Sequence, residues 1–217
     1  APISTIHTCV EVALAGYTSP EAVRDILVRI KRRTGELCDL IGDLLRLTRA
    51  REEASRDAQA QPVKPAELLE NVVELMKTEA HSKDLFLSVD IEPDLGLVWA
   101  NSERLKLVWT NLLSNAIKYT EPGGIISVAL KQDNDHLVAT VRDTGIGIPP
   151  GDQERIFEEF YRASNARMSC PVGTGVGLAI VQRIIENYGG EIWVESEYGR
   201  GTTFHVTADF GLGEEKA

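Results

Sequence analysis

The chain has 217 residues, which suits one large domain or an ordinary domain with a smaller unit attached. Apolar residues make up 43% and charged residues 26% of the chain, so it can bury a core and is not an extended disordered segment. The net charge of −10 argues against nucleic-acid binding as the main activity, because affinity for a phosphate backbone depends on clustered lysine and arginine.

Three cysteines without metal-ligand spacing indicate a reduced protein rather than a disulfide scaffold. No apolar run is long enough to span a bilayer, so a membrane anchor of the parent protein would lie upstream of Ala1. We therefore expect this portion to be cytoplasmic, with any contact to a membrane made through segments outside it.

Residues 1–57 predict a helical hairpin. A shorter helix over Pro2–Ala15 has apolar residues on one face, and a long helix over Pro20–Glu53 repeats apolar residues with heptad spacing. A hairpin with one apolar stripe per helix cannot bury both stripes alone, so we expect it to pair with a second copy into a four-helix bundle. Packing of the long helix against the rest of the same chain is the alternative.

Residues 62–213 follow a polar linker and predict a second domain of helices and strands. Helices are expected at Pro65–Thr78, Ser102–Tyr119 and Val176–Asn187. Strands are expected at Phe86–Ile91, Ile125–Lys131, His136–Asp143, Glu191–Glu195 and Thr203–Ala208. Helices combined with an antiparallel-leaning sheet indicate the α+β class, as a two-layer α/β sandwich preceded by the α-helical hairpin.

The predicted helix at Ser102–Tyr119 carries a polar stripe opposite its apolar face. Asn111, Asn115 and Lys118 recur at the spacing of one helical face. Asparagine is a poor residue inside a helix because its amide competes for backbone hydrogen bonds, so two of them one turn apart suggest a function. Amide oxygens suit Mg²⁺ and an ammonium group suits phosphate oxygens, which together indicate a magnesium-phosphate site. A solvated helix face is the alternative for this stripe alone.

Two glycine-rich segments flank a longer connection. Asp143–Pro150 reads DTGIGIPP after a predicted strand, where an aspartate can accept a hydrogen bond from an exocyclic amine such as that of adenine. Gly173–Ile180, GTGVGLAI, begins an apolar helix with three alternating glycines, whose unsatisfied N–H groups attract an anion. Between them, an aromatic run at Ile156–Tyr161 and a polar run at Arg162–Pro171 are typical of a closing lid. Taken singly, the segments also fit a tight turn, a plain helix entry and an ordinary surface loop.

In this order, the segments resemble the ATP-binding domain of the sensor histidine kinases, which is related to the gyrase, mismatch-repair and heat-shock chaperone ATPases. The resemblance covers residues 62–210 and rests on five motifs. They are Asn111–Thr120, similar to the family's N box, Asp143–Gly147, similar to its G1 box, Phe157–Tyr161, similar to its F box, Gly173–Gly177, similar to its G2 box, and Gly199–Phe204, similar to its last glycine turn.

The resemblance implies ATP and Mg²⁺ as ligands and a role for each matching residue. Asn115, helped by Asn111, would hold the metal on the triphosphate. Lys118, Tyr119 and Arg162 would contact phosphates, and Asp143 would bind the adenine amine. The full set implied to bind ATP is Asn111, Asn115, Lys118, Tyr119, Asp143, Gly145, Gly147, Ile148, Tyr161, Arg162, Gly173, Thr174, Gly175, Val176, Gly177, Leu178 and Thr203.

One position distinguishes kinases from hydrolases in this superfamily. The related ATPases carry a glutamate one turn before the magnesium asparagine, where this chain has Asn111, a poor general base. We therefore expect transfer of the γ-phosphoryl group to a histidine and then to an aspartate of a response-regulator receiver domain. The alternatives are a stand-alone ATPase or ATP-driven clamp, a nucleotide-binding scaffold without transfer activity, and a serine kinase of the anti-sigma type, which would lack the hairpin.

The N-terminus departs from the family's pattern. Its acceptor motif, His-Glu-x-Arg-x-Pro-Leu, is matched only at the end by Ala1–Ile3, which would place the acceptor histidine upstream of this chain. His7 is the obvious substitute, but it lacks an acidic neighbour and the motif's context. No catalytic residue is therefore expected within the chain, which should bind Mg·ATP without autophosphorylating and form a homodimer through its hairpin.

Overall fold

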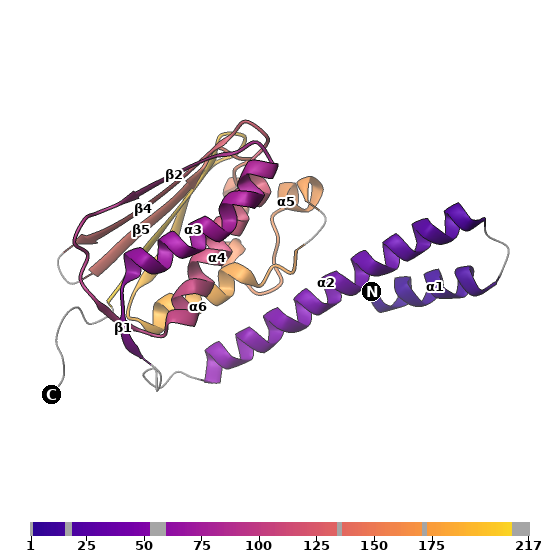
Figure 1. Ribbon diagram of the computed structural model, residues 1–217, viewed down its shortest axis with the longest axis horizontal. Coiled ribbons are helices and arrows are strands. Elements are labelled where there is room, and N and C mark those ends of the chain that lie inside the picture. Colours follow the sequence, from indigo (N-terminus) through magenta and orange to yellow (C-terminus); the bar gives the residue numbers. More distant parts are fainter. Residues whose placement is uncertain (1, 16–18, 53–59, 134–135, 171–172, 210–217) are drawn as a thin grey trace.

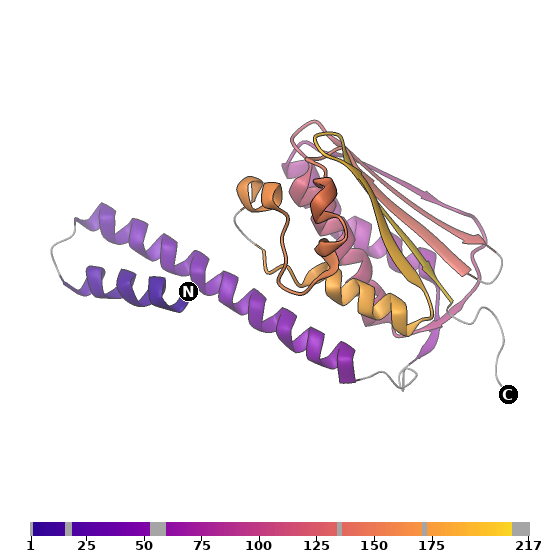
Figure 2. The ribbon, with the colours of Figure 1, turned by 180° about the vertical axis from the view of Figure 1, so that it is seen from behind.

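The computed structural model describes residues 2–15, 19–52, 60–133, 136–170 and 173–209 as a helical hairpin followed by a mixed α/β unit (Figure 1). The hairpin consists of α1 (Pro2–Leu14) and α2 (Pro20–Glu52), which pack along each other. Most of it projects away from the α/β unit, but α2 also contacts α6 (Gly177–Asn187) of the same chain (Figure 2). No helix in the described ranges combines the length and apolarity that crossing a membrane requires.

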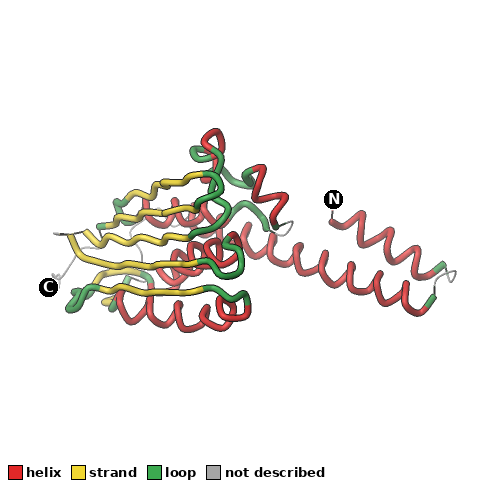
Figure 3. The backbone as a smooth tube through the Cα atoms, turned by 90° about the horizontal axis from the view of Figure 1, so that it is seen from above, coloured by secondary structure: helices red, strands yellow, loops and turns green. Residues whose placement is uncertain are grey.

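Five strands form one sheet in the order β2-β4-β5-β7-β6 (Figure 3). They are β2 (Phe86–Ile91), β4 (Ile125–Asp133), β5 (His136–Asp143), β6 (Glu191–Glu197) and β7 (Gly201–Ala208). β2 and β4 run parallel, and the other three pairings are antiparallel. The predicted α+β class and the two-layer sandwich, with a helical region in front of it, are confirmed.

Two short strands were not expected from the sequence. β1 (Gln61–Val63) and β3 (Val98–Ala100) pair antiparallel with each other, apart from the five-stranded sheet. Three residues are too few to show an alternation of apolar and polar side chains, so such strands leave no pattern to detect.

Three helices cover one face of the sheet: α3 (Pro65–Ser82), α4 (Ser102–Tyr119) and α6 (Figure 1). The apolar face of α4 is fully buried, with Leu105, Leu112 and Trp109 at most 1% exposed. On β4, alternate residues from Ile126 to Leu130 are buried in the same core. Each such side chain stabilises the fold by roughly 1.5–3 kcal/mol relative to its exposed state. Packing of this face directs the polar stripe of α4 away from the sheet.

Both ends of α4 are fixed by side chains. Asn101 caps the first turn, since its Oδ1 accepts hydrogen bonds from the backbone N–H groups of Glu103 at 3.0 Å and Arg104 at 3.2 Å. At the other end, Lys83 Nζ donates to the carbonyl oxygens of Ile117 and Lys118, each at 2.8 Å. A cation at this position also interacts favourably with the negative end of the helix dipole. The rotation and height of the polar stripe are thus set from both ends.

Candidate functional site

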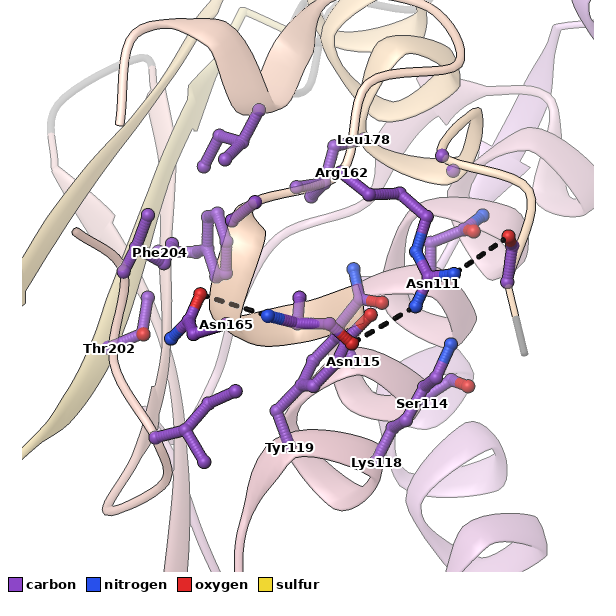
Figure 4. Close-up of a pocket in the computed structure, with 18 of the residues that line it drawn as sticks. Asn111, Ser114, Asn115, Lys118, Tyr119, Arg162, Asn165, Leu178, Thr202 and Phe204 are labelled. Carbon is purple, nitrogen blue, oxygen red and sulfur yellow. Dashed lines mark hydrogen bonds between the residues drawn. The ribbon is translucent and has the colours of Figure 1, made fainter. Parts of the chain in front are cut away.

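A cavity opens between α4, the loop after β5, the start of α6 and the long connection from Pro149 to Val176 (Figure 4). Fourteen of the seventeen residues proposed from the sequence line it: Asn111, Asn115, Lys118, Tyr119, Asp143, Gly147, Ile148, Tyr161, Arg162, Gly173, Thr174, Gly175, Gly177 and Leu178. The asparagine motif, the two glycine motifs and the aromatic motif therefore meet in one place, although up to about 60 residues separate them in the chain.

The polar stripe of α4 faces the N-terminus of α6 across this cavity. Asn111 Nδ2 donates to the carbonyl oxygen of Leu107 at 2.8 Å, which directs Oδ1 away from its own helix. That oxygen lies so close to α6 that a Cβ added to Gly177 would approach it to 2.4 Å, so a larger residue there would displace the Asn111 side chain. The amide groups of the two asparagines and the ammonium group of Lys118 thus lie beside the N-terminus of α6, a helix of 11 residues. This is the positive end of the helix dipole.

Asp143, the last residue of β5, places a carboxylate in the same cavity, where the residue is 6% exposed. Burial raises the pKa of this carboxyl to about 6, while hydrogen bonds from the backbone N–H groups of Gly145, at 2.8 Å, and Thr202 lower it. The group is therefore mostly ionised at neutral pH, although the residue is buried. A buried acceptor of this kind is suited to an amine donor of a ligand.

The loop after β5 is held rigidly against the sheet. The N–H of Ile148 donates to Ser196 Oγ at 2.8 Å, and Gln153 Nε2 donates to the carbonyl oxygens of Ile148 at 3.0 Å and Ser196 at 2.8 Å. Gly147 has a φ of +61°, and a Cβ there would lie 2.1 Å from the carbonyl oxygen of Glu197. Its conformation and its tight approach to β6 both require glycine.

The predicted lid consists of two 3₁₀ turns, Pro150–Asp152 and Arg155–Phe157, and a short helix, α5 (Ser164–Ser169). Arg162 bridges this segment: its guanidinium donates to the carbonyl oxygens of Ala166 at 3.1 Å and Gly173 at 3.4 Å (Figure 4). It also donates to the carbonyl oxygen of Cys170. The arginine expected to contact phosphates thus lines the cavity while hydrogen-bonded to the lid itself.

Three proposed residues lie outside the lining. Gly145 packs against the end of α4, Val176 is completely buried in the core, and Thr203 is on the face of β7 opposite to the helices. Its neighbour Thr202 is buried and lines the cavity instead, because successive residues of a strand point to opposite faces.

The sequence interpretation assigned no individual role to eight further lining residues, although all lie within the predicted motifs and lid: Ser114, Ile146, Ile156, Ala163, Asn165, Ala166, Thr202 and Phe204. Ser114 and the strand residues could have been found from the faces of their elements. Asn165 gave no signal, since its environment is made by the folded lid.

His7 lies on an exposed part of α1. Thr8 follows it where the acceptor motif has glutamate, but its Nδ1 lies 3.5 Å from Glu11 Oε1, because residues four apart meet on one face of α1. Both side chains are well exposed and neither lines the cavity.

Comparison with known proteins agrees with this geometry. The model of the histidine kinase-, DNA gyrase B- and HSP90-like ATPase family matches residues 100–212, more than half of the chain. The chain belongs to this ATPase family. It is 39% identical over 173 residues to the adaptive-response sensory kinase SasA of Synechococcus elongatus, covering 79% of this chain and 44% of that protein. It is 34% identical over 208 residues to the sensor histidine kinase RppB of Synechocystis, covering 95% of this chain and 45% of RppB. The chain thus spans less than half the length of these two family members.

Two solved structures of family members have the same fold. Full-length ShkA in complex with AMPPNP matches with a TM-score of 0.74 and 26% identity, covering 98% of this chain and 47% of ShkA. The histidine kinase ThkA, in complex with the response regulator TrrA, matches with a TM-score of 0.75 over 96% of this chain and 57% of ThkA. At 22% identity, the second match shows the shared fold alone.

We predict that Asp143 titrates near pH 6. Because its pKa in the folded protein lies above the unfolded value of 3.8, folding takes up a proton between about pH 4 and 6. The stability that this group contributes is therefore present below about pH 4 and is lost as the pH rises through 6. The amide resonance of Gly145, which donates to Asp143, should shift with a midpoint near 6 in an NMR titration. A midpoint near 4, or an unchanged titration in Asp143→Asn, would contradict this prediction.

Proposed function

We propose that this chain is the ATP-binding catalytic part of a sensor histidine kinase, with residues 62–213 binding Mg·ATP and residues 1–57 forming part of the dimerisation and phosphotransfer hairpin. The observation that carries the proposal is the arrangement of one cavity. Asn111, Asn115 and Lys118 face the N-terminus of α6, and the buried carboxylate of Asp143 lies in the same space. ShkA, of the same fold, binds an ATP analogue.

The residues present fit both a nucleotide and a metal ion. Asp143 would accept a hydrogen bond from the adenine amine, and Lys118 with the N-terminus of α6 would bind phosphate oxygens. In the described residues no cluster of histidine, cysteine or carboxylate side chains could hold a metal alone. Mg²⁺ would therefore be held by the amide oxygens of Asn115 and Asn111 together with the phosphates, and would neutralise charge during transfer. The orientation of Asn111, with Nδ2 bonded to Leu107, leaves its oxygen on the side of the cavity.

The same asparagine favours phosphoryl transfer over hydrolysis. A water-activating base would have to accept a proton, and an amide has no basic atom for this role. Phosphoryl transfer needs positioning and charge stabilisation more than proton chemistry, and the cavity offers both. The acceptor is then a histidine upstream of this chain, and the relay partner is a receiver domain, as in the complex of ThkA with TrrA.

The helical hairpin supports a homodimer. On α2, the heptad row of Val23, Ile30 and Leu37 is half-buried, and α1 packs along this helix. A second row contains Leu27 and Ile41, which are 57% and 51% exposed. Exposed leucine and isoleucine at heptad spacing are stabilised when a second hairpin covers them, which completes a four-helix bundle.

Nucleotide binding is the first test. Calorimetric titration of AMPPNP with Mg²⁺ should show binding to the native chain, and Asp143→Ala should weaken it by about 10- to 100-fold, because a hydrogen bond to a charged group contributes about 1.5–3 kcal/mol. Asp90→Ala, which removes an exposed aspartate from β2, is the matched control and should bind as the native chain does. Absence of binding to the native chain would refute the proposal.

Transfer activity is the second test. Incubated alone with γ-labelled ATP, the chain should neither acquire acid-labile label nor release phosphate continuously. Mixed with a longer version that carries the upstream acceptor helix and has Asn115→Ala in its own site, the native chain should label that protein. Asn115→Ala in both proteins should reduce the label to background because Mg²⁺ is no longer held. Steady release of phosphate by the chain alone would instead identify a stand-alone ATPase.

Dimerisation is the third test. In sedimentation velocity the native chain should be dimeric, and Leu27→Lys should raise the dissociation constant at least about tenfold, because a charged group replaces a buried leucine in the bundle. Lys31→Ala, at an exposed position one turn further along α2, is the control and should remain dimeric. A native monomer, or a dimer unaffected by Leu27→Lys, would exclude this interface.

A further inference from the structure

We propose that Asn165 is a positioning residue that fixes the lid helix α5 against the wall of the cavity formed by Gly147, and thereby sets affinity for the nucleoside part of the nucleotide. This inference rests on the proposed nucleotide binding and deepens it. It concerns a residue that contributes no phosphate or metal contact in that proposal.

The side chain of Asn165 is inaccessible and uses both of its polar atoms. The residue is 7% exposed, Nδ2 donates to the carbonyl oxygen of Gly147 at 2.7 Å, and Oδ1 accepts from the N–H of Ala166 at 2.9 Å. A buried amide is costly to leave without partners, so this pair of bonds specifies one orientation. The bond to Gly147 links the lid to the glycine loop 18 residues earlier in the chain.

The helix that carries Asn165 depends on such links. α5 has only six residues, too few for a helix to be stable through its own hydrogen bonds. Asp152 fixes its first turn: Oδ2 accepts from the N–H of Ser164 at 3.1 Å and from its hydroxyl at 3.3 Å. The other oxygen accepts from the hydroxyl of Tyr161 at 2.6 Å, and this bond holds the pKa of Asp152 below its usual range. Asp152 and Asn165 thus attach α5 at two points, in addition to the bond that Arg162 donates to the carbonyl oxygen of Ala166.

Both attachment points belong to a rigid part of the site. Gly147 is held by its approach to Glu197, and Gln153, next to Asp152, bridges the carbonyl oxygens of Ile148 and Ser196. The sheet therefore fixes the position of α5 through these two segments. Two small residues beside Asn165, Ala163 and Ala166, line the cavity, so this position also sets the width of the cavity at that wall.

Asn165 and Arg162 act at different sides of the cavity. Figure 4 shows Asn165 close to Thr202 and Phe204, and Arg162 toward Asn111. Thr202 is paired with Asp143 in the sheet, which is the proposed adenine-binding side, whereas Asn111 belongs to the proposed metal and phosphate side. Loss of the Asn165 bond should therefore weaken binding of every adenine nucleotide by the same factor, irrespective of its number of phosphates.

The test compares AMP, ADP and AMPPNP, each measured in competition with a labelled ATP analogue in the presence of Mg²⁺. Asn165→Asp has nearly the same shape but presents an oxygen to the carbonyl of Gly147 in place of a donor. We expect it to weaken all three ligands about tenfold with an unchanged ratio between them. Arg162→Ala should instead weaken AMPPNP more than AMP. Ser169→Ala, at an exposed position of the same helix, is the matched control and should bind all three as the native chain does.

A purely structural role for Asn165 predicts a lower melting temperature without a change in the three affinities, and that result would overturn the proposal. So would a loss confined to AMPPNP. Should Asn165→Asp fail to fold, Asp152→Asn tests the same attachment from the other side and should give the uniform pattern at about threefold. If the native chain binds none of the ligands, the proposed function fails. If the native chain and both variants bind the ligands equally well, only the proposed role of Asn165 fails.

Discussion

The hydrogen bonds that fix the loop after β5 to both neighbouring elements are the constraint on which the site depends. Ile146 donates through its N–H to the carbonyl oxygen of Tyr119 at 3.1 Å, and its own carbonyl accepts from the N–H of Gly199 at 2.9 Å. The first bond ties the loop to the end of α4, and the second ties it to the turn between β6 and β7. The carboxylate of Asp143 and the polar stripe of α4 therefore keep a fixed separation, which a ligand spanning both would require.

α4 supplies this geometry at some cost to its own stability. Two asparagines within the helix interior lower its propensity, and Asn111 uses its amide group to bond the carbonyl of Leu107. The completely buried apolar face, the Asn101 cap and the Lys83 contact with the last carbonyl groups offset this cost. The raised pKa of Asp143 also indicates a cost in stability, because a carboxylate kept ionised in a buried site destabilises the ligand-free protein at neutral pH. Such residues are retained for binding rather than for folding.

Helices and strands whose apolar and polar residues alternate with a regular period could be predicted from the sequence. The stripe of Asn111, Asn115 and Lys118 and the strands of the main sheet follow from spacing alone, because a helix or strand places such residues on one face. Thr203, which the family resemblance implied, shows how sensitive such an assignment is: one residue away from Thr202, the side chain lies on the opposite face of the sheet. Asn165 could not be found, since its partner lies 18 residues away and meets it only once the lid has folded.

The lid contains two kinds of attachment, and they respond differently to a charged ligand. Asn165 bonds Gly147 in the loop after β5, and Asp152 bonds Ser164 at the start of α5. A nucleotide offers these bonds nothing to exchange. Arg162 donates to carbonyl oxygens, including that of Gly173, and these are neutral acceptors. Phosphate oxygens are charged and form stronger hydrogen bonds with a guanidinium, so a triphosphate competes for this side chain. Under the proposed function, phosphate binding would then break the bonds from Arg162 to Gly173 and to α5, while the bonds of Asn165 and Asp152 keep α5 against the nucleoside wall.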